Sequence, residues 1–578
     1  MRRRLASGLA LLVSVPVVLS ARGGLASASA PFGEAPTAHS RLGAVASATP
    51  EATAAGAAVL AAGGNAVDAA VTTAFALAVT YPPAGNLAGG GFAVGRTPGG
   101  ELWALDFRET APAGTWRNSF LGPDGRARRG ASTRGGLAVA TPGTVRGLEA
   151  LHRRYGKLPW ARLIAPAARL ARDGFRVPPG LAKIFSAYAG DLARDPAASV
   201  LFAPGGVPLA AGALLVQEDL ARTLETIAAQ GADGFHRGAV ARRVAAFVQA
   251  TGGVLTEEDL AGYRPEWRSP FVFDDGRFRL VTMPLPSSGG FLLASILGQL
   301  RFVRGAIDDR DAPETLHLVA EAERRAYADR NRFLGDPACV DVPLAALLAP
   351  ARLAALGFSI DPARATPSSS IVGGAWPREP DQTTHYVTAT ADGGAVSVTY
   401  TLNDTLGNRT VVPGVGVLLN NEMDDFAVEP GAANAYGLVQ GESNAVRAGA
   451  RPLSSMTPLV VLEDGRPRLV LGSPGGGVIP TTVLQVYLNA ARRGEPLGEA
   501  VAARRFHHQH LPDRIELEGG AFPEDVKATL RAKGHALDER GTLYTGGTLG
   551  RVHAIAFEKD GSLTAAADPR GYGAAAGP

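Results

Sequence analysis

Asp381-Gln382-Thr383-Thr384-His385-Tyr386 places a threonine pair at the head of a predicted β-strand, and the interpretation of the whole chain follows from it. The loop before this stretch is rich in serine, glycine and proline, which is typical of an accessible connection. A threonine hydroxyl is a weak nucleophile unless a base lies beside it, and an N-terminal threonine can use its own α-amine as that base. The stretch therefore predicts a precursor that activates itself by cutting the bond between Gln382 and Thr383.

A second strand is predicted at residues 395–402, after a turn formed by Asp392-Gly393-Gly394. Two alternating runs joined by such a turn indicate a β-hairpin. If the turn is centred on residues 392–394, Thr383 lies opposite residues 402–404. The hairpin therefore brings Thr401 and Asn403 close to the proposed nucleophile.

The composition is typical of a large globular protein, with 578 residues of which 46% are hydrophobic and 19% charged. A formal net charge of +3 is small for this length and gives no indication of nucleic-acid binding. Cys339 is the only cysteine, so no internal disulfide is expected.

The first 30 residues have the three regions of a secretory signal. Arg2-Arg3-Arg4 precede an apolar run at residues 9–19, and small residues follow at 26–30. We expect cleavage after Ala28 or Ala30 and export to the periplasm or the medium. A membrane anchor is the alternative, but the apolar run is short for a bilayer span, so no stable span is expected.

The rest of the chain alternates between helical and extended patterns. A run of small residues and prolines after the signal, residues 31–47, predicts an extended arm, and the last residues, 571–578, look frayed. The segments with a clear helical or strand pattern are residues 51–80 (helical, broken at Gly63-Gly64-Asn65), 102–107 (strand), 140–360 (mostly helical) and 314–333 (one long helix with Glu321, Glu323, Arg324 and Arg325 on its polar side).

Several short motifs occur in a fixed order along the chain. They are Gly64-Asn65-Ala66-Val67-Asp68-Ala69-Ala70, Leu105-Asp106-Phe107-Arg108-Glu109, Thr383-Thr384-His385-Tyr386, Thr401-Leu402-Asn403, Asn420-Asn421-Glu422-Met423-Asp424-Asp425-Phe426, Pro452-Leu453-Ser454-Ser455-Met456 and Gly472-Ser473-Pro474-Gly475-Gly476. Each motif is weak alone, but the ordered set resembles the γ-glutamyltranspeptidase (glutathione hydrolase) family over residues 40–570.

The resemblance implies an α/β fold of the N-terminal-nucleophile hydrolase type, a four-layer αββα sandwich. It also implies that residues 31–382 form a large, mostly helical subunit and residues 383–578 a small subunit that carries the nucleophile. The two subunits arise from one precursor and stay together as a heterodimer.

The activity that the resemblance implies is transfer of a γ-glutamyl group, from glutathione or a similar amide, to water or to an amino acid or peptide. Thr383 carries the group as an ester, and Thr401 hydrogen-bonds the nucleophile or its amine. Asn403 contacts the α-amino end of the substrate. Gly475 and Gly476 supply backbone N–H groups to an oxyanion hole, where the lack of a Cβ permits close approach.

A γ-glutamyl donor ends in an α-carboxylate and an α-ammonium, and the matching motifs contain groups for both. Arg108 can place two N–H groups on a carboxylate, with hydroxyls from Ser454 and Ser455 beside it. Glu422 and Asp425 can pair with the ammonium. Some family members carry glutamine at the position of Glu422.

A loop at residues 426–441 resembles the lid that many family members have, and Tyr436 in it is expected to cover the bound glutamyl group. Two alternatives stay open: a cephalosporin (glutaryl) acylase on the same scaffold, and an uncleaved, non-catalytic paralogue. The triple glycine Gly89-Gly90-Gly91 indicates close packing or site lining, not a phosphate loop. The cluster His507-His508-Gln509-His510 is too cramped for a metal site, so neither metal nor cofactor is expected.

Overall fold

The computed structural model describes residues 31–373, 382–429, 441–540 and 548–578. The predicted signal segment, residues 1–30, and the predicted lid residue Tyr436 lie outside these ranges. No helix within them is long and apolar enough to cross a membrane.

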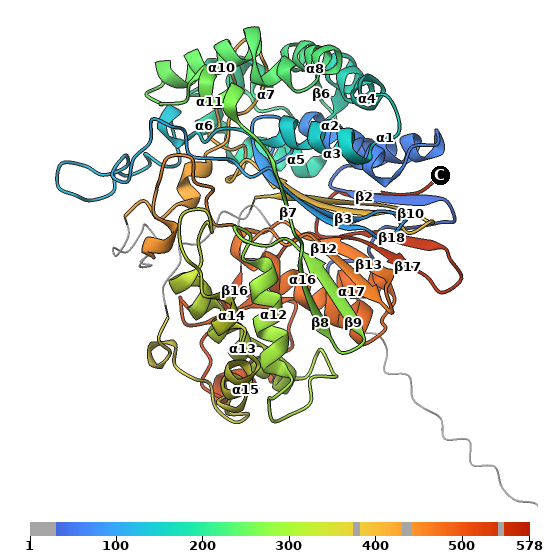
Figure 1. The fold of residues 1–578 in the computed structure, drawn as a ribbon, viewed down its shortest axis with the longest axis vertical. Coiled ribbons are helices and arrows are strands. Elements are labelled where there is room, and N and C mark those ends of the chain that lie inside the picture. The colour runs from blue at the N-terminus through green and yellow to red at the C-terminus, as the bar shows by residue number, and fades with distance from the viewer. Residues whose placement is uncertain (1–30, 374–381, 430–440, 541–547) are drawn as a thin grey trace, which may run out of the picture.

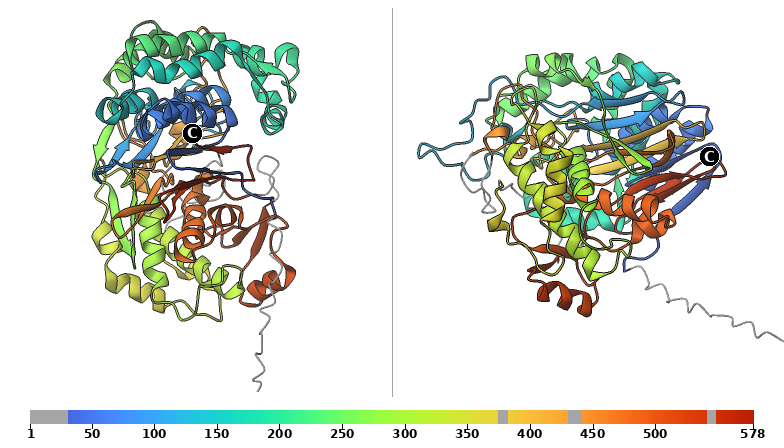
Figure 2. Two further views of the ribbon diagram at one scale, coloured as in Figure 1. Left: turned by 90° about the vertical axis from the view of Figure 1, so that its right-hand side faces the viewer. Right: turned by 60° about the horizontal axis from the view of Figure 1, so that its bottom comes forward.

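Two seven-stranded sheets lie face to face at the centre of the described structure, with helices on both outer faces (Figures 1 and 2). The first sheet has the order β19-β2-β10-β11-β3-β4-β7 and the second β1-β18-β17-β13-β12-β9-β8. This arrangement confirms the αββα sandwich. The strands of the first sheet are β2 (Gly43–Ser47), β3 (Gly90–Arg96), β4 (Leu102–Asp106), β7 (Glu266–Arg268), β10 (Thr384–Thr390), β11 (Ala395–Thr401) and β19 (Ala574–Ala576). Those of the second are β1 (Thr37–Ser40), β8 (Phe271–Asp275), β9 (Phe278–Thr282), β12 (Leu459–Glu463), β13 (Arg466–Gly472), β17 (His553–Phe557) and β18 (Leu563–Ala567).

One helical layer covers the outer face of the first sheet, where Figure 1 shows α2 and α3 above β2 and β3. Its helices are α1 (Pro50–Ala61), α2 (Ala66–Thr80), α3 (Thr144–Tyr155), α4 (Trp160–Asp173), α5 (Pro179–Ala187), α6 (Ala189–Leu192), α7 (Pro196–Phe202), α8 (Glu218–Gln230), α9 (Asp233–His236), α10 (Gly238–Ala250) and α11 (Glu257–Gly262). The predicted break between two helices is confirmed, because Asn65 caps α2 and forms a capping box with Asp68. Tyr386 and Tyr400 face this layer, and the Tyr400 hydroxyl donates to the carbonyl of Ala74 in α2 at 3.0 Å.

The other helical layer lies beyond the second sheet (Figure 2, left view). It contains α12 (Gly289–Leu300), α13 (Pro313–Phe333), α14 (Leu344–Leu347), α15 (Pro350–Phe358), α16 (Ile479–Tyr487), α17 (Leu497–Ala502) and α18 (Glu524–Ala532). The remaining described strands are short: β5 (Phe175–Arg176), β6 (Leu214–Leu215), β14 (Phe506–His507), β15 (Ile515–Glu518) and β16 (Leu537–Arg540).

The long helix α13 begins one residue before the predicted segment and ends with it, but its polar side is buried. Glu321 accepts hydrogen bonds from Arg324 at 3.1 Å and from Arg325 at 2.7 Å. Buried charges are tolerated when they are paired and hydrogen-bonded in this way. The helix therefore presents its charges to neighbouring segments of the protein instead of to solvent.

The predicted β10–β11 hairpin is present, but its register differs from the expected one. Thr384 pairs with Tyr400, so the ladder continues to Thr383 opposite Thr401, not opposite residues 402–404. The turn closes earlier than assumed, because the Thr390 N–H donates to the Gly394 carbonyl at 2.9 Å. Gly393 supplies the positive φ of 92° that this turn requires.

Both ends of the described chain are strands, which corrects two predictions. The expected arm at residues 31–47 contains β1 and β2, and the expected frayed end at 571–578 contains β19, which pairs with β2. The small residues of these two segments gave only a weak strand pattern in the sequence. In the fold, β19 supplies hydrogen-bond partners to the backbone of β2 at its outer edge.

Segments from before and after residue 382 share both sheets. β10 and β11 pair with each other and lie between β2 and β3, which come from the first part of the chain. Residues 31–382 and 383–578 are therefore interleaved parts of one body and not adjacent domains.

Candidate active site

Thr401 holds the backbone at the bond where cleavage is predicted. Its hydroxyl donates to the Gln382 carbonyl at 3.0 Å and accepts from the Asn403 N–H at 2.8 Å. Thr383 is only 5% exposed and directly precedes β10. We expected Thr401 to contact the nucleophile or its amine; in this uncut chain its hydroxyl lies on the carbonyl that a nucleophile would attack.

Asn403 follows Thr401 with a left-handed backbone, at φ 77°. Asparagine tolerates this conformation better than most residues do. Its side-chain amide donates to the Asn421 carbonyl at 2.9 Å. Asn403 therefore ties β11 to the loop that carries the acidic residues of the site.

Asn86 fixes Thr401 from behind, a role that the sequence did not reveal. Its amide donates to the Thr401 carbonyl at 2.9 Å, and its oxygen accepts from the Gly89 N–H at 3.0 Å. Gly89 packs so closely that a Cβ there would lie 2.0 Å from the same carbonyl oxygen. This confirms close packing as the role of the first glycine of the run at residues 89–91.

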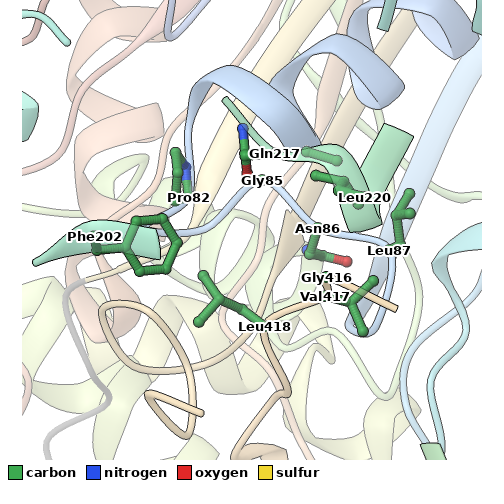
Figure 3. Close-up of a pocket in the computed structure, with 11 residues that line it drawn as sticks. Pro82, Gly85, Asn86, Leu87, Phe202, Gln217, Leu220, Gly416, Val417 and Leu418 are labelled. Atoms are coloured by element: carbon green, nitrogen blue, oxygen red, sulfur yellow. The ribbon is translucent and has the colours of Figure 1, made fainter. Parts of the chain in front are cut away.

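Asn86 also lines a small pocket (Figure 3). Phe202, Leu220 and Leu418 line it together with Asn86, and none of its lining residues is charged. A zwitterionic substrate would find no ionic partner in this pocket, so we assign it no substrate.

A buried charge cluster lies beside Thr383. The Arg108 guanidinium forms ion pairs with Glu422 and Asp425, and its Nη1 lies 3.5 Å from Glu109. We expected Arg108 to bind one end of a substrate while Glu422 and Asp425 bind the other. In the structure, these opposite charges pair with one another.

Burial governs the ionisation of this cluster. It raises the pKa of Glu422 to about 8 and that of Glu109 to about 7, although Arg108 opposes both shifts. Burial lowers the pKa of Arg108, but attraction to Glu422 and Asp425 outweighs it and leaves that pKa above its ordinary value. Glu109 was not among the predicted site residues; its signal was its position next to Arg108 in the quoted motif.

The two predicted serines are held by groups on the second helical layer. Arg330 of α13 donates to the Ser455 hydroxyl at 2.7 Å and to the Ser288 hydroxyl at 2.9 Å. Ser288 in turn donates to the Ser454 carbonyl at 2.8 Å. Arg330 therefore positions the serine pair, and no motif in the sequence pointed to it.

The glycine pair of the predicted oxyanion hole has an unusual backbone. Gly475 and Gly476 have φ values of 135° and 57°, and a Cβ on Gly475 would lie 2.7 Å from Val478. Their amide N–H groups have no hydrogen-bond partner among the described residues. The Tyr327 hydroxyl braces the loop by donating to the Gly477 carbonyl at 2.5 Å.

Most of the predicted site residues line one small pocket, here called the threonine pocket. Its lining residues are Arg108, Thr383, Thr401, Asn403, Glu422, Asp425, Ser454, Met456, Gly476 and Ile479. Ser455 and Gly475 lie next to lining residues without lining the pocket themselves. The structure thus brings together residues that are up to 371 positions apart, from Arg108 to Ile479.

The histidine cluster lies elsewhere and belongs to the packing of the second helical layer. His507 hydrogen-bonds Thr481 of α16 at 2.9 Å, and the backbone N–H of His508 donates to Glu323 of α13 at 2.9 Å.

Two stacked sheets with a threonine at the head of an inner strand, beside unpaired backbone N–H groups, define an N-terminal-nucleophile hydrolase. The gamma-glutamyltranspeptidase family model matches residues 52–578, and the chain belongs to this family. A glutathione hydrolase proenzyme of Escherichia coli (strain K12) is 44% identical over 536 residues, which are 92% of this chain and 91% of the relative.

Solved structures agree with this assignment. A cephalosporin acylase from Bacillus halodurans superposes with a TM-score of 0.81 at 28% identity, covering 94% of this chain and 97% of that one. A Helicobacter pylori gamma-glutamyltranspeptidase chain is 40% identical with a TM-score of 0.55. It covers 56% of this chain, while 93% of its own length is covered.

Proposed function

We propose that this protein is an exported proenzyme that cuts itself between Gln382 and Thr383 and then works as a γ-glutamyltransferase and glutathione hydrolase. The observation that carries the proposal is the hydrogen bond from Thr401 to the Gln382 carbonyl, directly beside a buried Thr383. The name proenzyme on the Escherichia coli relative supports processing. The partial coverage by the Helicobacter pylori chain fits a mature protein of two chains.

In the self-cleavage step, the Thr383 hydroxyl attacks the carbonyl carbon of Gln382. The C–N bond breaks, a C–O ester forms, and the nitrogen of Thr383 becomes a free amine. Thr401 stabilises the developing negative charge on the carbonyl oxygen by its hydrogen bond. Water then hydrolyses the ester and releases the carboxylate of Gln382.

In the mature enzyme the same hydroxyl attacks a γ-glutamyl amide, and the new α-amine takes its proton. The amine of the leaving group departs with a proton, and the glutamyl group remains as an ester on Thr383. The unpaired N–H groups of Gly475 and Gly476 are suited to hold the oxyanion. Water or an acceptor amine then removes the glutamyl group.

Arg108, Glu422 and Asp425 explain how the donor is recognised. A bound α-carboxylate replaces the two acids as the partner of Arg108, and the freed acids pair with the α-ammonium. The ligand thus exchanges the contacts within this cluster for contacts with its own two charges, and its ammonium favours the ionised form of Glu422, whose pKa burial raises to about 8. Ser454, which lines the pocket, is placed to add a hydroxyl donor to the carboxylate, and Ser455 lies directly beside it.

A glutaryl-specific acylase is the second candidate, because a cephalosporin acylase superposes well on this chain. A glutaryl group carries no ammonium, however, and it would leave Glu422 and Asp425 without a cationic substrate group. The two buried acids therefore favour a γ-glutamyl donor.

The test combines processing with substrate choice. Purified protein should run as two bands, with Thr383 as the first residue of the smaller fragment, and Thr383→Ala should run as one. The processed enzyme should release a chromogenic amine from a γ-glutamyl anilide at least about a hundredfold faster than from the matching glutaryl anilide, since an unpaired buried charge costs several kcal/mol. A single band for the fully matured wild type would contradict self-cleavage, and a faster glutaryl reaction would select the acylase.

A further inference from the structure

A second pocket borders the start of β10, the strand that follows Thr383. It has a volume of about 430 Å³ and is lined by Thr384 and Pro474, among others. Thr384 follows the nucleophile, and Pro474 precedes the glycine pair of the threonine pocket. The same two segments of chain therefore border both pockets, and Thr383 itself lines the threonine pocket.

Arg551 and Lys183 line this second pocket, here called the basic pocket, and carry unpaired positive charge. Lys183 of α5 is exposed, and Arg551 is half-buried. Neither side chain has a carboxylate partner among the described residues; the Arg551 guanidinium donates to the Tyr81 hydroxyl at 3.4 Å.

The other charges that line the basic pocket cancel within a buried network. Arg570 pairs with Glu518 at 2.6 Å and with Asp568 at 3.1 Å, and Arg505 pairs with Asp568 at 2.7 Å. Burial lowers the pKa of His553 to about 4, so its ring is neutral at pH 7. The pocket therefore carries a net positive charge from Arg551 and Lys183.

Three polar groups on the wall of the basic pocket lack partners. Within the described part of the chain, the Thr384 hydroxyl, the Tyr572 hydroxyl and Nδ1 of His553 are buried without a hydrogen bond. Buried polar groups are normally satisfied, so unpaired ones beside a cavity indicate a place for a polar ligand or for water.

We propose that the basic pocket binds the α-carboxylate of the acceptor amino acid or peptide, with Arg551 as its main partner. This inference rests on the proposed transferase function. The amine of the acceptor, after losing a proton to solvent, attacks the glutamyl ester on Thr383. A C–N bond forms, the bond from the carbonyl carbon to Thr383 Oγ1 breaks, and the proton of the amine passes through the Thr383 α-amine to that oxygen.

The charges of the two pockets suit the two substrates. The threonine pocket offers both signs, as a zwitterionic donor requires. The basic pocket offers positive charge, and its one lining carboxylate, Asp568, is already held by two arginines. An acceptor bound there has its carboxylate held while its amine meets no anion that would keep it protonated, which suits an amine that must attack in its neutral form.

The test compares a dipeptide acceptor with the same dipeptide as its carboxamide, using processed enzyme and a γ-glutamyl anilide donor. In Arg551→Gln, the acceptor KM for glycylglycine should rise about tenfold to a hundredfold, the value of a charge-assisted hydrogen bond, while the KM for glycylglycinamide stays within about twofold. Arg551→Lys should keep part of the preference for the free acid. Arg153→Gln, on the exposed side of α3, is the matched control and should keep the full preference.

The outcomes separate the inference from the function on which it rests. If Arg551→Gln raises the KM of both acceptors equally, or of neither, the pocket does not bind the acceptor carboxylate and the inference is wrong. Two bands on a gel show that the variant has folded and processed. A wild type that hydrolyses no γ-glutamyl donor would overturn the proposed function itself, and this inference would fall with it.

Discussion

The threonine pocket and the basic pocket border the same pair of strand ends but differ in the burial and pairing of their charged side chains. In the first, Arg108 is buried and paired with Glu422 and Asp425. In the second, Arg551 is half-buried and has no carboxylate partner in the described residues. A buried charge is stable only when it is paired, whereas a charge near the surface is stabilised by hydration and needs no partner within the protein.

This difference follows from the charge of the ligand that we assign to each pocket. A site for a zwitterion needs both signs of charge, and the two signs can neutralise each other. A site for a single carboxylate has no such internal partner and must keep its cation close to solvent. The depth of each pocket thus follows from the charge pattern of the ligand that we assign to it.

Arg108→Gln would break the paired pocket and should have the largest effect. It removes the partner of the donor carboxylate and leaves two buried acids without their cation. We expect the kcat/KM for a γ-glutamyl anilide to fall by about a thousandfold, as for other buried charge pairs that lose one member. Steady-state kinetics on processed enzyme measures this.

Arg108→Lys is the informative control, because it keeps the charge but loses the planar fork that reaches two groups at once. We expect it to lie between wild type and Arg108→Gln. Equal activity in Arg108→Lys and wild type would contradict a role for the planar guanidinium. Normal activity in Arg108→Gln would contradict the assignment of the threonine pocket as the donor site.

Thr401→Val tests the hydrogen bond at the proposed cleavage site in the threonine pocket. It keeps the shape of the side chain but removes the hydroxyl on the Gln382 carbonyl. We expect self-cleavage to slow by about a hundredfold, the usual effect of losing one donor to a developing oxyanion. The appearance of two bands with time measures the rate.

Thr401→Ser keeps the hydroxyl and should cleave close to the wild-type rate. If Thr401→Val cleaves as fast as Thr401→Ser, the hydrogen bond to the carbonyl does not assist the reaction. The two variants together separate the hydroxyl from the packing of β11.

Glu422→Gln sharpens the comparison through pH. The pKa of Glu422 is raised to about 8 in the folded chain, against about 4.5 when unfolded, so its stabilising contribution is present at low pH and is lost as pH rises towards 8. The advantage of the wild type over Glu422→Gln in Tm should therefore shrink from pH 5 to pH 8 and then level off.

This measurement is cleanest in the Thr383→Ala background, where both proteins keep the uncut chain of the structure. Glu109, whose pKa is raised to about 7, interacts with Glu422 and titrates in the same range, so the pH range of the change belongs to the pair of acids. A Tm difference that stays constant or grows with pH would show that Glu422 is ionised in the folded chain.

The sequence predicted the parts of the site that depend on local pattern. Alternation and turn residues placed Thr383 at the head of a hairpin and Thr401 near it. The register was wrong by one to three residues, because the turn closes between Thr390 and Gly394 and the sequence does not fix which residues close it. The resemblance supplied Arg108, Glu422 and Asp425, but not their pairing with one another.

Features that depend on long-range packing could not be predicted. A helical period shows which residues of α13 share a face, but not whether that face meets solvent. Glu321 accepts from the backbone N–H of Thr366 at 3.1 Å, a contact that only the folded chain creates. The basic pocket is of the same kind, because Lys183 and Arg551 are 368 positions apart in the chain and belong to no motif.

Lys183→Gln should have the smallest effect and tests the open character of the basic pocket. Lys183 is exposed, so its attraction to an acceptor carboxylate is screened by water and salt. We expect the acceptor KM of the variant to rise only about twofold at low salt, and the difference from wild type to vanish near 0.5 M salt. Arg551→Gln should keep most of its effect at the same salt concentration, because its partner is bound deeper. If both variants lose their effects together, the two cations act only by long-range attraction, and the basic pocket steers the acceptor without binding its carboxylate.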